Sequence, residues 1–369
     1  MTDWARALET GWVVDGAVPG PDVDEFAEPA EVTAALARSR EPSLLAVQHP
    51  HRTPEAHGRT LSEALPGARR MLDQLLSTAY QRVHDVVAVY EVAGRTIGVL
   101  CLIDPAAVDD QVRHSEQVYP GIVAERAAML AGLGRATSAA MLMPIGAGAR
   151  LTSLAQRAVA GRPPLVATPD AHRLWLAGPG PVQDELLAAV RSRPLLVADG
   201  NHRVAASAAA GSSLLALVTA GPHLRLGAIH RTIAGTGLTT AELAAAWRRA
   251  GLTVREVRDP APPRVPGTVT VPAGLVVELP EPTGPRPRID HGIVEELLLS
   301  DALGLDPEGP HVRVLPEGHD PGPDVDAILQ LAPVPLADVL AVHDQGRLMP
   351  RKSTYFTPKP RSGLLIAQL

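Results

Sequence analysis

The stretch that decides the fold is LLVADGNHRVAASAAAG, which runs from Leu195 to Gly211. Its apolar start predicts a strand at Leu195–Ala198, and an alanine-rich helix is predicted to begin directly after Asp199-Gly200. A glycine at such a turn lets the backbone bend sharply, while the first N–H groups of the helix and its dipole favour a bound anion. The stretch therefore predicts a strand–turn–helix unit with an anion-binding turn, which we call the box (residues 199–203).

Two side chains of the box add hydrogen-bond donors in the first turn of the predicted helix. Arg203 carries a planar, permanently charged guanidinium that suits phosphate or carboxylate, and His202 can exchange a proton near neutral pH. A second interpretation stays open here: Asp199 only caps the helix, while His202 and Arg203 lie on its solvated side. The rest of the chain has to decide between the two.

Composition is typical of a globular protein with a sizeable core. The chain has 369 residues, 46% of them hydrophobic, and a formal net charge of −6. The acidic balance and the absence of basic runs argue against a nucleic-acid partner. The single cysteine, Cys101, lies in an apolar run and is predicted to be a buried structural thiol. Because no signal peptide or membrane-spanning stretch is recognisable, we expect a cytoplasmic protein without a membrane partner.

Predicted strands and helices alternate along the chain, which indicates a mixed α/β (α+β) fold. The predicted elements include strands at Ser43–Gln48 and Ala139–Pro144, a hairpin of 85–91 with 95–103, and a helix at 61–79. Proline-rich stretches at 259–266 and 280–287 mark loops or a soft boundary. We expect a core in residues 1–239, an α/β addition in 240–345, and a C-terminal segment, 346–369, that returns to the site.

Several separated blocks together resemble the bacterial domain-of-unknown-function family 1015, whose members end a strand on an Asp-Gly-His-His-Arg box. The blocks are residues 41–50, 113–116 with Glu125-Arg126, 171–175, the box, 228–231, and LMPRKSTYFTPK at 348–359. The last run is the most specific, because a string of that length is hard to match by chance. The resemblance covers most of the chain and implies a core similar to ParB-like and sulfiredoxin-like domains and to archaeal free-serine kinases.

The resemblance implies transfer of a phosphoryl group from a nucleotide to the hydroxyl of a small molecule, preferably serine or another hydroxy amino acid. Such a reaction needs a phosphate cradle, cations, usually Mg²⁺, and a group that orients or deprotonates the hydroxyl. The implied cofactors are ATP or ADP and Mg²⁺. Gly200, Asn201, His202 and Arg203 would hold the phosphates. Asp199 would cap the turn or bind Mg²⁺, and both Asp199 and His202 are candidate catalytic residues.

Glu116 is the candidate base, because the family's His-Glu pair falls on Ser115-Glu116 of this sequence. Ser115 departs from the family pattern, and His114 is a candidate substitute for the missing histidine. Asn201 is a second departure; its amide neither titrates nor acts as a nucleophile, which excludes sulfiredoxin-type chemistry but not anion binding. The alternative for Glu116 is an ordinary surface carboxylate.

Two further segments are candidates for the site. A cationic, hydroxyl-rich stretch between two prolines can present a point charge and hydroxyls to a phosphate; it consists of Lys352, Ser353 and Thr354. The alternative is an edge strand, 353–356, that only closes the fold. His230 and Arg231 are candidate contacts for the acceptor's carboxylate, with a solvated surface pair as the alternative.

Three classes of function remain compatible with the sequence. The first is a small-molecule kinase. The second is a non-catalytic nucleotide- or phosphate-binding regulatory protein of ParB-like ancestry, and the third is a phosphoester hydrolase in which Glu116 activates water. No histidine or cysteine array suggests a zinc site, and no Walker-type loop is present. The sequence sets neither the acceptor, nor the nucleotide, nor the oligomeric state.

Overall fold

The structure, a computed structural model, describes residues 3–21, 23, 29–39, 42–94, 96–146, 148–219, 224–282, 287–322 and 324–369. The chain divides into two compact units. Unit 1 comprises residues 1–114, 118–224 and 358–369, and unit 2 comprises residues 115–117 and 225–357. Both units combine helices with sheets, so the predicted mixed α/β fold is confirmed.

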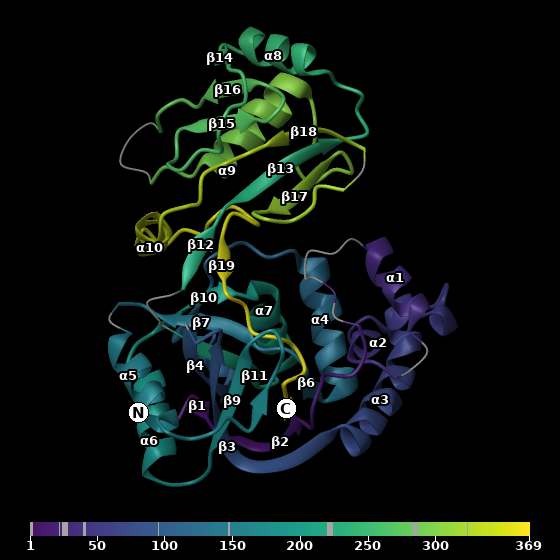
Figure 1. Ribbon diagram of the computed structural model, residues 1–369, viewed down its shortest axis with the longest axis vertical. Helices are drawn as coiled ribbons and strands as arrows, with labels where there is room; N and C mark the ends of the chain where they lie inside the picture. The colour runs from purple at the N-terminus through teal and green to yellow at the C-terminus, as the bar shows by residue number, and fades with distance from the viewer. Residues whose placement is uncertain are drawn as a thin grey trace. The chain divides into compact units, whose positions relative to one another are not determined.

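Unit 1 is built on one large mixed sheet (Figure 1). Its strands follow the order β5 (Val112–Arg113), β10 (Leu195–Asp199), β7 (Ala140–Pro144), β11 (Leu214–Thr219), β4 (Thr96–Ile103), β3 (Tyr80–Val92), β2 (Leu8–Val14), β20 (Leu365–Gln368) and β6 (Arg135–Ala136). β1 (Ala5–Arg6) pairs with β4, while β9 (His172–Ala177) lies between β3 and β8 (Val166–Ala167). β10 is parallel to β5 but antiparallel to β7, so both kinds of pairing meet at the strand that carries the box.

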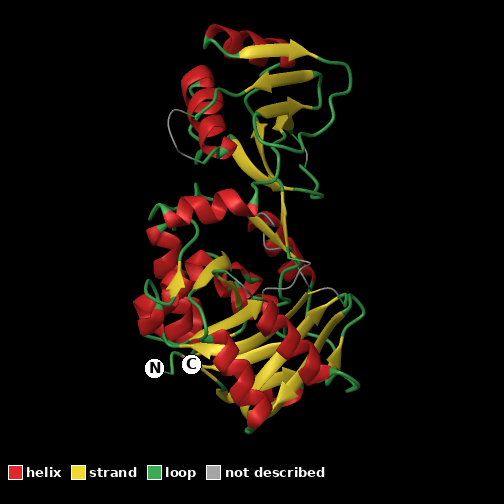
Figure 2. Cartoon of the chain, turned by 90° about the vertical axis from the view of Figure 1, so that its left-hand side faces the viewer, coloured by secondary structure: helices red, strands yellow, loops and turns green. Residues whose placement is uncertain are grey.

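Helices pack on both faces of this sheet because its central strands are apolar on both sides (Figure 2). The helices of unit 1 are α1 (Pro29–Arg38), α2 (Leu44–Gln48), α3 (Leu61–Thr78), α4 (Pro120–Leu133), α5 (Ala149–Val159), α6 (Pro181–Val190) and α7 (Asn201–Ala210). Leu100 and Leu102 of β4 join the core under α2 and α3, whereas Val99 and Cys101 join the core under α5 and α6. Cys101 is fully buried, and burial raises the pKa of its thiol to about 12, as expected of a structural cysteine.

The local predictions are confirmed at most of these elements. Strand 139–144, the helix at 61–79 and the hairpin of β3 with β4 are all present, although Arg95 of the predicted hairpin lies outside the described residues. The strand predicted at Ser43–Gln48 is wrong, because these residues form α2 and the Ser43 hydroxyl caps it by accepting the Ala46 N–H. A short apolar run suits a buried helix as well as a buried strand.

Unit 2 contains smaller sheets. Among its described residues, β17 (Val312–Pro316), β13 (Ile229–Ala234) and β18 (Val325–Leu329) form one sheet, and β14 (Thr253–Glu256), β16 (Leu275–Glu278) and β15 (Thr268–Val271) form another. A two-stranded ribbon joins β12 (Arg225–Gly227) to β19 (Tyr355–Thr357). The helices are α8 (Thr240–Arg249), α9 (Asp290–Ile293), its π-helical continuation η4 (Val294–Asp301), and α10 (Leu336–Asp344). Trp247 is fully buried in their core and donates its indole N–H to the Leu298 carbonyl.

The sequence predicts three segments, 1–239, 240–345 and 346–369. The two units of the structure begin and end at other residues. β12 and β13 lie before residue 240 but belong to unit 2, and residues 358–369 belong to unit 1, where β20 joins the large sheet. The three segments stay a prediction about domains. None of the described helices combines the length and the apolar character that crossing a bilayer requires.

Candidate functional site

The box forms a sharp turn between β10 and α7, as the sequence predicts. Gly200 is the first residue past the strand and has φ +92°, a left-handed conformation that side chains other than glycine rarely adopt. A Cβ atom on Gly200 would lie 2.6 Å from Nε of Arg203. Gly200 therefore does two things: it turns the chain, and it leaves room for the Arg203 guanidinium to fold back over the turn.

Two cationic side chains bind the carboxylate of Asp199. Arg203 pairs with its Oδ2 atom, and Lys359 places Nζ 2.8 Å from its Oδ1 atom. The N-cap residue of α7 is Gly200, which has no side chain that could cap the helix. Because both of its oxygens pair with cations, Asp199 does more than cap the helix. Asp199 holds two cations at the start of the helix.

Arg126 adds a third positive charge to this region. It comes from α4 and lines the same pocket as Arg203. Desolvation lowers the pKa of Arg126, and the Arg203 charge lowers it further. No residue that the structure describes forms an ion pair with Arg126. Arg203 and Lys359 pair with Asp199, while the charges of Glu125 and Asp199 raise the pKa of Arg126. The three cations outnumber these two carboxylates, so the site keeps an excess of positive charge beside the N-terminus of α7.

The pocket that Arg126 and Arg203 line is formed by residues of α2, α4 and α7, of β6 and β11, and of the loops beside them. One part of its lining is apolar and consists of Met129, Leu130, Leu133, Ala136, Leu214 and Leu215. The other part carries amide, hydroxyl and guanidinium groups, from Gln48, Arg126, Arg135, Thr137, Ser138, Arg203 and Ser213. No aspartate or glutamate is found among the described residues that line it. The pocket is suited to a ligand with an anionic end and a neutral, largely apolar body.

The two middle residues of the box hold a neighbouring part of the chain. Asn201 is buried, and its Oδ1 atom accepts a hydrogen bond from Nδ1 of His114 at 3.1 Å. Nε2 of His202 accepts the backbone N–H of Tyr119 at 2.9 Å, and the two rings stack with centroids 5.7 Å apart. His202 is thus neutral at Nε2 and engaged with the backbone in this structure. Its predicted roles in catalysis and phosphate binding stay predictions.

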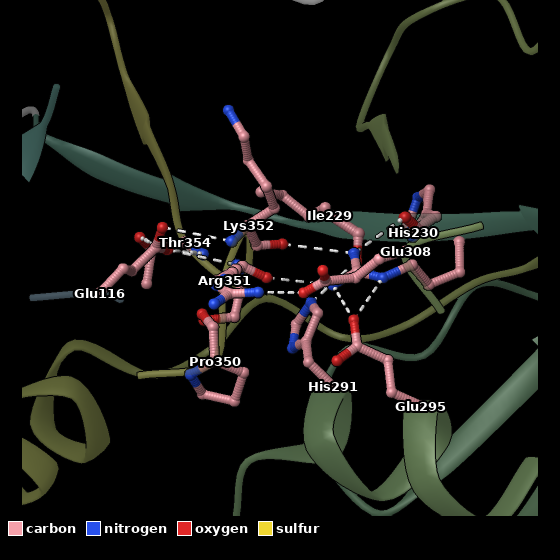
Figure 3. Close-up of polar contacts among 12 residues, drawn as sticks. Glu116, Ile229, His230, His291, Glu295, Glu308, Pro350, Arg351, Lys352 and Thr354 are labelled. Carbon is pink, nitrogen blue, oxygen red and sulfur yellow. Dashed lines mark hydrogen bonds and ion pairs between the residues drawn. The ribbon is translucent and has the colours of Figure 1, made fainter. Parts of the chain in front are cut away.

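Unit 2 contains a second polar group, centred on Glu116 (Figure 3). The carboxylate accepts the N–H groups of Lys352 at 3.2 Å, Ser353 at 3.2 Å and Thr354 at 2.9 Å, and the Thr354 hydroxyl at 2.6 Å. Lys352 has φ +52°, and this left-handed turn lets consecutive N–H groups converge in an anion-binding nest. Glu116 is therefore not a solvated surface carboxylate; it is the anion of a nest formed by residues 352–354.

Burial and hydrogen bonding act on Glu116 in opposite directions. Burial raises the pKa of its carboxyl group, whereas the hydroxyl and N–H of Thr354, the charge of Lys352 and the N–H of Ser353 lower it. Desolvation is the larger effect, so the pKa is raised overall. Lys352, Ser353 and Thr354 were predicted to contact a phosphate, but their N–H groups bind Glu116 here. The alternative strand at 353–356 is present only in part, because β19 begins at Tyr355.

Arg231 is buried and hydrogen-bonded on all sides. Its Nε and Nη2 groups donate to Oε1 of Glu295, at 2.9 and 2.6 Å. Nη1 donates to the carbonyls of His230 and Lys352, and Nη2 donates also to the carbonyl of Arg351. These contacts use the five N–H donors of a guanidinium, and none remains for a substrate carboxylate. The structure favours a structural role for Arg231 over the predicted substrate contact.

His230 is also buried, so the alternative of a solvated pair is wrong for both residues. Nδ1 of His230 accepts the backbone N–H of Leu331 at 3.1 Å. Burial, together with the Arg231 charge, lowers the pKa of His230 although Glu317 raises it. His230 is therefore a neutral core histidine here, and its contact with substrate stays a prediction.

We expect the buried residue His291 on α9 to make the protein less stable in acid. It is fully buried, its Nε2 group donates to the Ile229 carbonyl at 2.9 Å, and its pKa is lowered to about 3, first by burial and then by the Arg231 charge. Below about pH 6.5 the unfolded chain protonates this histidine while the folded chain does not. The free energy of unfolding is therefore expected to fall as the pH is lowered below 6.5, by at most roughly 1 kcal/mol per pH unit from this group.

Urea unfolding between pH 7.5 and pH 4.5 checks this expectation. His291→Gln keeps a donor for the Ile229 carbonyl but does not titrate, so its unfolding free energy should fall less steeply with acid than that of the parent. His57→Gln, at an exposed histidine, should leave the slope unchanged. Parallel slopes for the parent and His291→Gln would contradict the assignment.

The sequence predicts most of these residues as members of one site, and it does not predict which of them pair with one another. The structure brings Glu116 together with residues 352–354 in unit 2, and Asp199 together with Arg203 in unit 1. Lys359 and Arg126 lie in the sequence blocks that resemble the family, but the sequence assigns neither of them a role. Their one signal was a cationic side chain inside a recognisable block, and only the fold shows what each of them faces.

The described residues do not form a protein-held magnesium site. Both oxygens of Asp199, the predicted metal ligand, face cations, and no cluster of three or more histidine, cysteine, aspartate or glutamate side chains suitable for a metal is found in the described part of the chain. Mg²⁺ commonly binds through substrate phosphates with few protein ligands. Asp199 as a metal ligand stays a prediction that this geometry does not favour.

Fold and site together define a mixed α/β protein with a cationic strand–turn–helix box. The model of the family described as "Protein of unknown function (DUF1015)" matches residues 24–270, more than half of the chain. The chain belongs to this family, which confirms the resemblance seen in its sequence blocks. The match ends before the run at 348–359, so the family model does not test that run. No curated protein matches the chain.

The solved structures that match the chain are distant. SbnI with a C-terminal truncation from Staphylococcus aureus is 13% identical with a TM-score of 0.43, over 73% of this chain and 87% of that one. A conserved hypothetical protein from Pyrococcus furiosus is 12% identical with a TM-score of 0.39, over 71% and 93%. A free serine kinase in complex with AMP is 13% identical with a TM-score of 0.40, over 72% and 92%.

Proposed function

We propose that this protein is a phosphotransferase that binds a nucleotide, ATP or ADP, at the box and transfers a phosphoryl group to the hydroxyl of a small metabolite, preferably serine or another hydroxy amino acid. The observation that carries the proposal is the cluster of Arg126, Arg203 and Lys359 around the carboxylate of Asp199. Phosphoryl transfer depends mainly on positioning and on positive charge at the phosphates. This cluster supplies both at a helix N-terminus.

The charge balance of the box favours a polyphosphate over a single carboxylate ligand. Arg203 offers a planar pair of donors and Lys359 a point charge, and the first N–H groups of α7 add oriented dipoles. Asp199 neutralises only one of the three cations. A bound phosphate chain would take over donors of Arg203 and Lys359 while Asp199 keeps the two side chains in place.

The adjoining pocket is suited to the nucleoside of the donor. A nucleobase is a flat, neutral heterocycle, which matches the apolar lining of Leu130 and Leu214 and the amide and hydroxyl groups of the same lining. The ammonium group of an amino acid would need a carboxylate partner, and the described lining offers none. We therefore place the nucleoside, not the acceptor, in this pocket.

Glu116 is the proposed base for the acceptor hydroxyl. A carboxyl group with a pKa raised by burial can take up a proton more readily than a solvated one, and its hydrogen bonds to residues 352–354 fix its orientation. Glu116 lies two residues after His114 in the sequence, and His114 contacts Asn201 of the box. The role of Glu116 would be to orient and deprotonate the hydroxyl.

A regulatory nucleotide-binding protein of ParB-like ancestry is the second candidate. The four hydrogen bonds that Glu116 accepts favour this second candidate. A carboxylate bound in this way can hold residues 352–354 in place without acting as a base. The two candidates, and a phosphoester hydrolase, differ in what happens to the nucleotide. A kinase consumes it only with an acceptor, a hydrolase releases phosphate without one, and a regulatory protein leaves it intact.

The test is a screen of the full chain with ATP or ADP, Mg²⁺ and a panel of hydroxy amino acids, with nucleotide products and phosphorylated acceptors measured. We expect acceptor-dependent formation of the lower nucleotide and a phosphorylated product. Phosphate release without an acceptor would support the hydrolase instead. Binding without any consumption of nucleotide would support the regulatory protein.

The pocket gives a prediction of its own. Leu130→Glu places a carboxylate in the pocket and is expected to weaken nucleotide binding at least about tenfold, or about 1.4 kcal/mol, while tripolyphosphate binding changes less. Titration calorimetry with both ligands measures the two effects. Ile122→Glu, an exposed position on the same helix, is the control. Equal losses for nucleotide and tripolyphosphate would contradict a nucleoside in the pocket.

A further inference from the structure

We propose that Arg231 is a positioning residue that orients the carboxylate of Glu116 through two intervening peptide groups. Arg231 acts from strand β13, and the peptide groups belong to the segment Arg351–Ser353. This inference deepens the proposed function, because it rests on Glu116 as the base. It also assigns a purpose to a buried arginine that the predicted substrate contact does not explain.

Each of the two peptide groups has the guanidinium on its carbonyl side and Glu116 on its amide side. In the peptide between Arg351 and Lys352, the carbonyl accepts from Nη2 of Arg231 at 3.3 Å and the N–H donates to Oε2 of Glu116 at 3.2 Å. In the next peptide, the Lys352 carbonyl accepts from Nη1 at 3.2 Å and the Ser353 N–H donates to Oε1 at 3.2 Å.

A trans peptide points its carbonyl and its N–H in opposite directions. The positive guanidinium and the negative carboxylate therefore bind the same two peptide groups from opposite sides. A cation at the carbonyl end polarises a peptide group and makes its N–H a stronger donor, and such chains of hydrogen bonds strengthen one another by roughly 10–30% per bond. Arg231 thus strengthens and aims two of the bonds that hold Glu116.

The conformation of Lys352 needs such support. At φ +52° it lies in the left-handed region, which a lysine seldom occupies and which persists only when surrounding contacts determine it. Arg231 binds the carbonyls on both sides of the Lys352 Cα atom, those of residues 351 and 352. Losing these bonds would free the turn to relax and would move the N–H groups away from Glu116.

Arg231 is itself fixed by Glu295 on the π-helical segment η4. Its side chain is only 2% exposed, and both Nε and Nη2 bind one oxygen of Glu295. Figure 3 shows Glu116 and Glu295 on opposite sides of the segment that carries Arg351 and Lys352. A buried ion pair contributes little net stability, since desolvation offsets its attraction. The fixed position of the guanidinium is a better reason for the pair.

We call this chain of contacts from Arg231 through the two peptide groups to Glu116 the relay. On its own segment, Arg351 forms an ion pair with Glu308. Lys352 faces Glu116, and the neutral donors Ser353 and Thr354 complete that side. Glu295, His230 and His291 surround Arg231. A change at Arg231 therefore reaches Glu116 through the peptide groups and through Lys352, while the neighbouring histidines are neutral.

The test is the titration of Glu116 itself, followed by carbon NMR in the full chain labelled at glutamate carboxyl carbons. Glu116→Gln assigns its signal. Arg231→Met is expected to raise the proton affinity of Glu116 about tenfold, and Arg231→Lys, which keeps the charge without the planar fork, should give a smaller increase. Glu295→Gln should raise the proton affinity of Glu116 by about as much as Arg231→Lys does, because it loosens the guanidinium without removing it.

Activity supplies the second measurement. We expect the acid limb of the pH profile of kcat/KM to move to higher pH, most in Arg231→Met and less in Arg231→Lys and Glu295→Gln. In Arg231→Met, kcat should fall about tenfold while the KM for nucleotide stays unchanged. If Arg231→Met does not fold, Arg231→Lys and Glu295→Gln carry the test. A titration of Glu116 that is unchanged in every folded variant overturns the relay.

The relay and the proposed function fail in different ways. If the titration of Glu116 moves as expected but the parent phosphorylates no acceptor, the relay stands and the kinase proposal falls. If the parent is active and the titration stays the same, the kinase proposal stands and the relay falls. A merely structural Arg231 would lower the unfolding free energy without moving the Glu116 titration.

Discussion

Glu116→Gln is expected to lower kcat for phosphoryl transfer by about 10²–10⁴-fold while the affinity for nucleotide stays the same. An amide has nearly the size of a carboxylate but cannot take up the acceptor's proton. Its NH₂ group would also face a backbone N–H of residues 352–354, so the nest loses a negative acceptor as well. Steady-state kinetics with the acceptor found in the screen, together with nucleotide titration, measure both parts.

Glu296→Gln is the matched control for this variant, since Glu296 is an exposed glutamate next to Glu295 in the same unit. It should retain the kcat and KM of the parent. If Glu116→Gln keeps more than half of the parent's kcat, Glu116 is not the base and serves only to hold residues 352–354. The regulatory candidate would then gain support.

Arg203→Met is expected to weaken nucleotide and tripolyphosphate binding together, by about 10- to 100-fold. Hydrogen bonds to charged groups contribute about 1.5–3 kcal/mol each, and methionine has a similar length without a charge. The change also removes one of the two cations that pair with Asp199 and leaves Lys359 as the other. The net positive charge around Asp199 therefore falls. Calorimetric titration at two salt concentrations measures the loss and its electrostatic origin.

Arg203→Met should weaken the binding of both nucleotide and tripolyphosphate, whereas Leu130→Glu should strongly weaken the binding of the nucleotide alone. Arg150→Met, at an exposed arginine at the start of α5, should bind both ligands like the parent. An unchanged nucleotide affinity in Arg203→Met would show that the box does not bind the phosphates.

The local part of the site could be predicted from the sequence. Residues 195–211 contain all that their conformation needs: an apolar strand, a glycine that accepts φ +92°, and alanines that favour a helix. The prediction failed at Ser43–Gln48 because its signal, a short apolar run, does not distinguish a buried helix from a buried strand.

The partners of the charged residues could not be predicted, because they depend on segments far apart in the sequence. Glu116 binds N–H groups 236 to 238 residues further along the chain. Arg231 was assigned to a substrate because it suits a carboxylate, and it does bind one, but that carboxylate belongs to Glu295. A residue type predicts the chemistry of a partner, whereas burial decides whether the partner comes from the protein or from a ligand.

The position of β20 has a consequence for the order in which the protein folds. β20 lies between β2 and β6 in the large sheet, and Gly11 of β2 pairs with Ala367. Such a pairing closes a loop of nearly the whole chain, and contacts of that sequence separation are slow to form because loop closure costs entropy first. Lys359 precedes β20 by a few residues and is brought to Asp199 by the same closure. The Lys359 partner of Asp199 therefore arrives late in folding, so intermediates with most of their secondary structure formed would still lack the complete cationic cluster around Asp199.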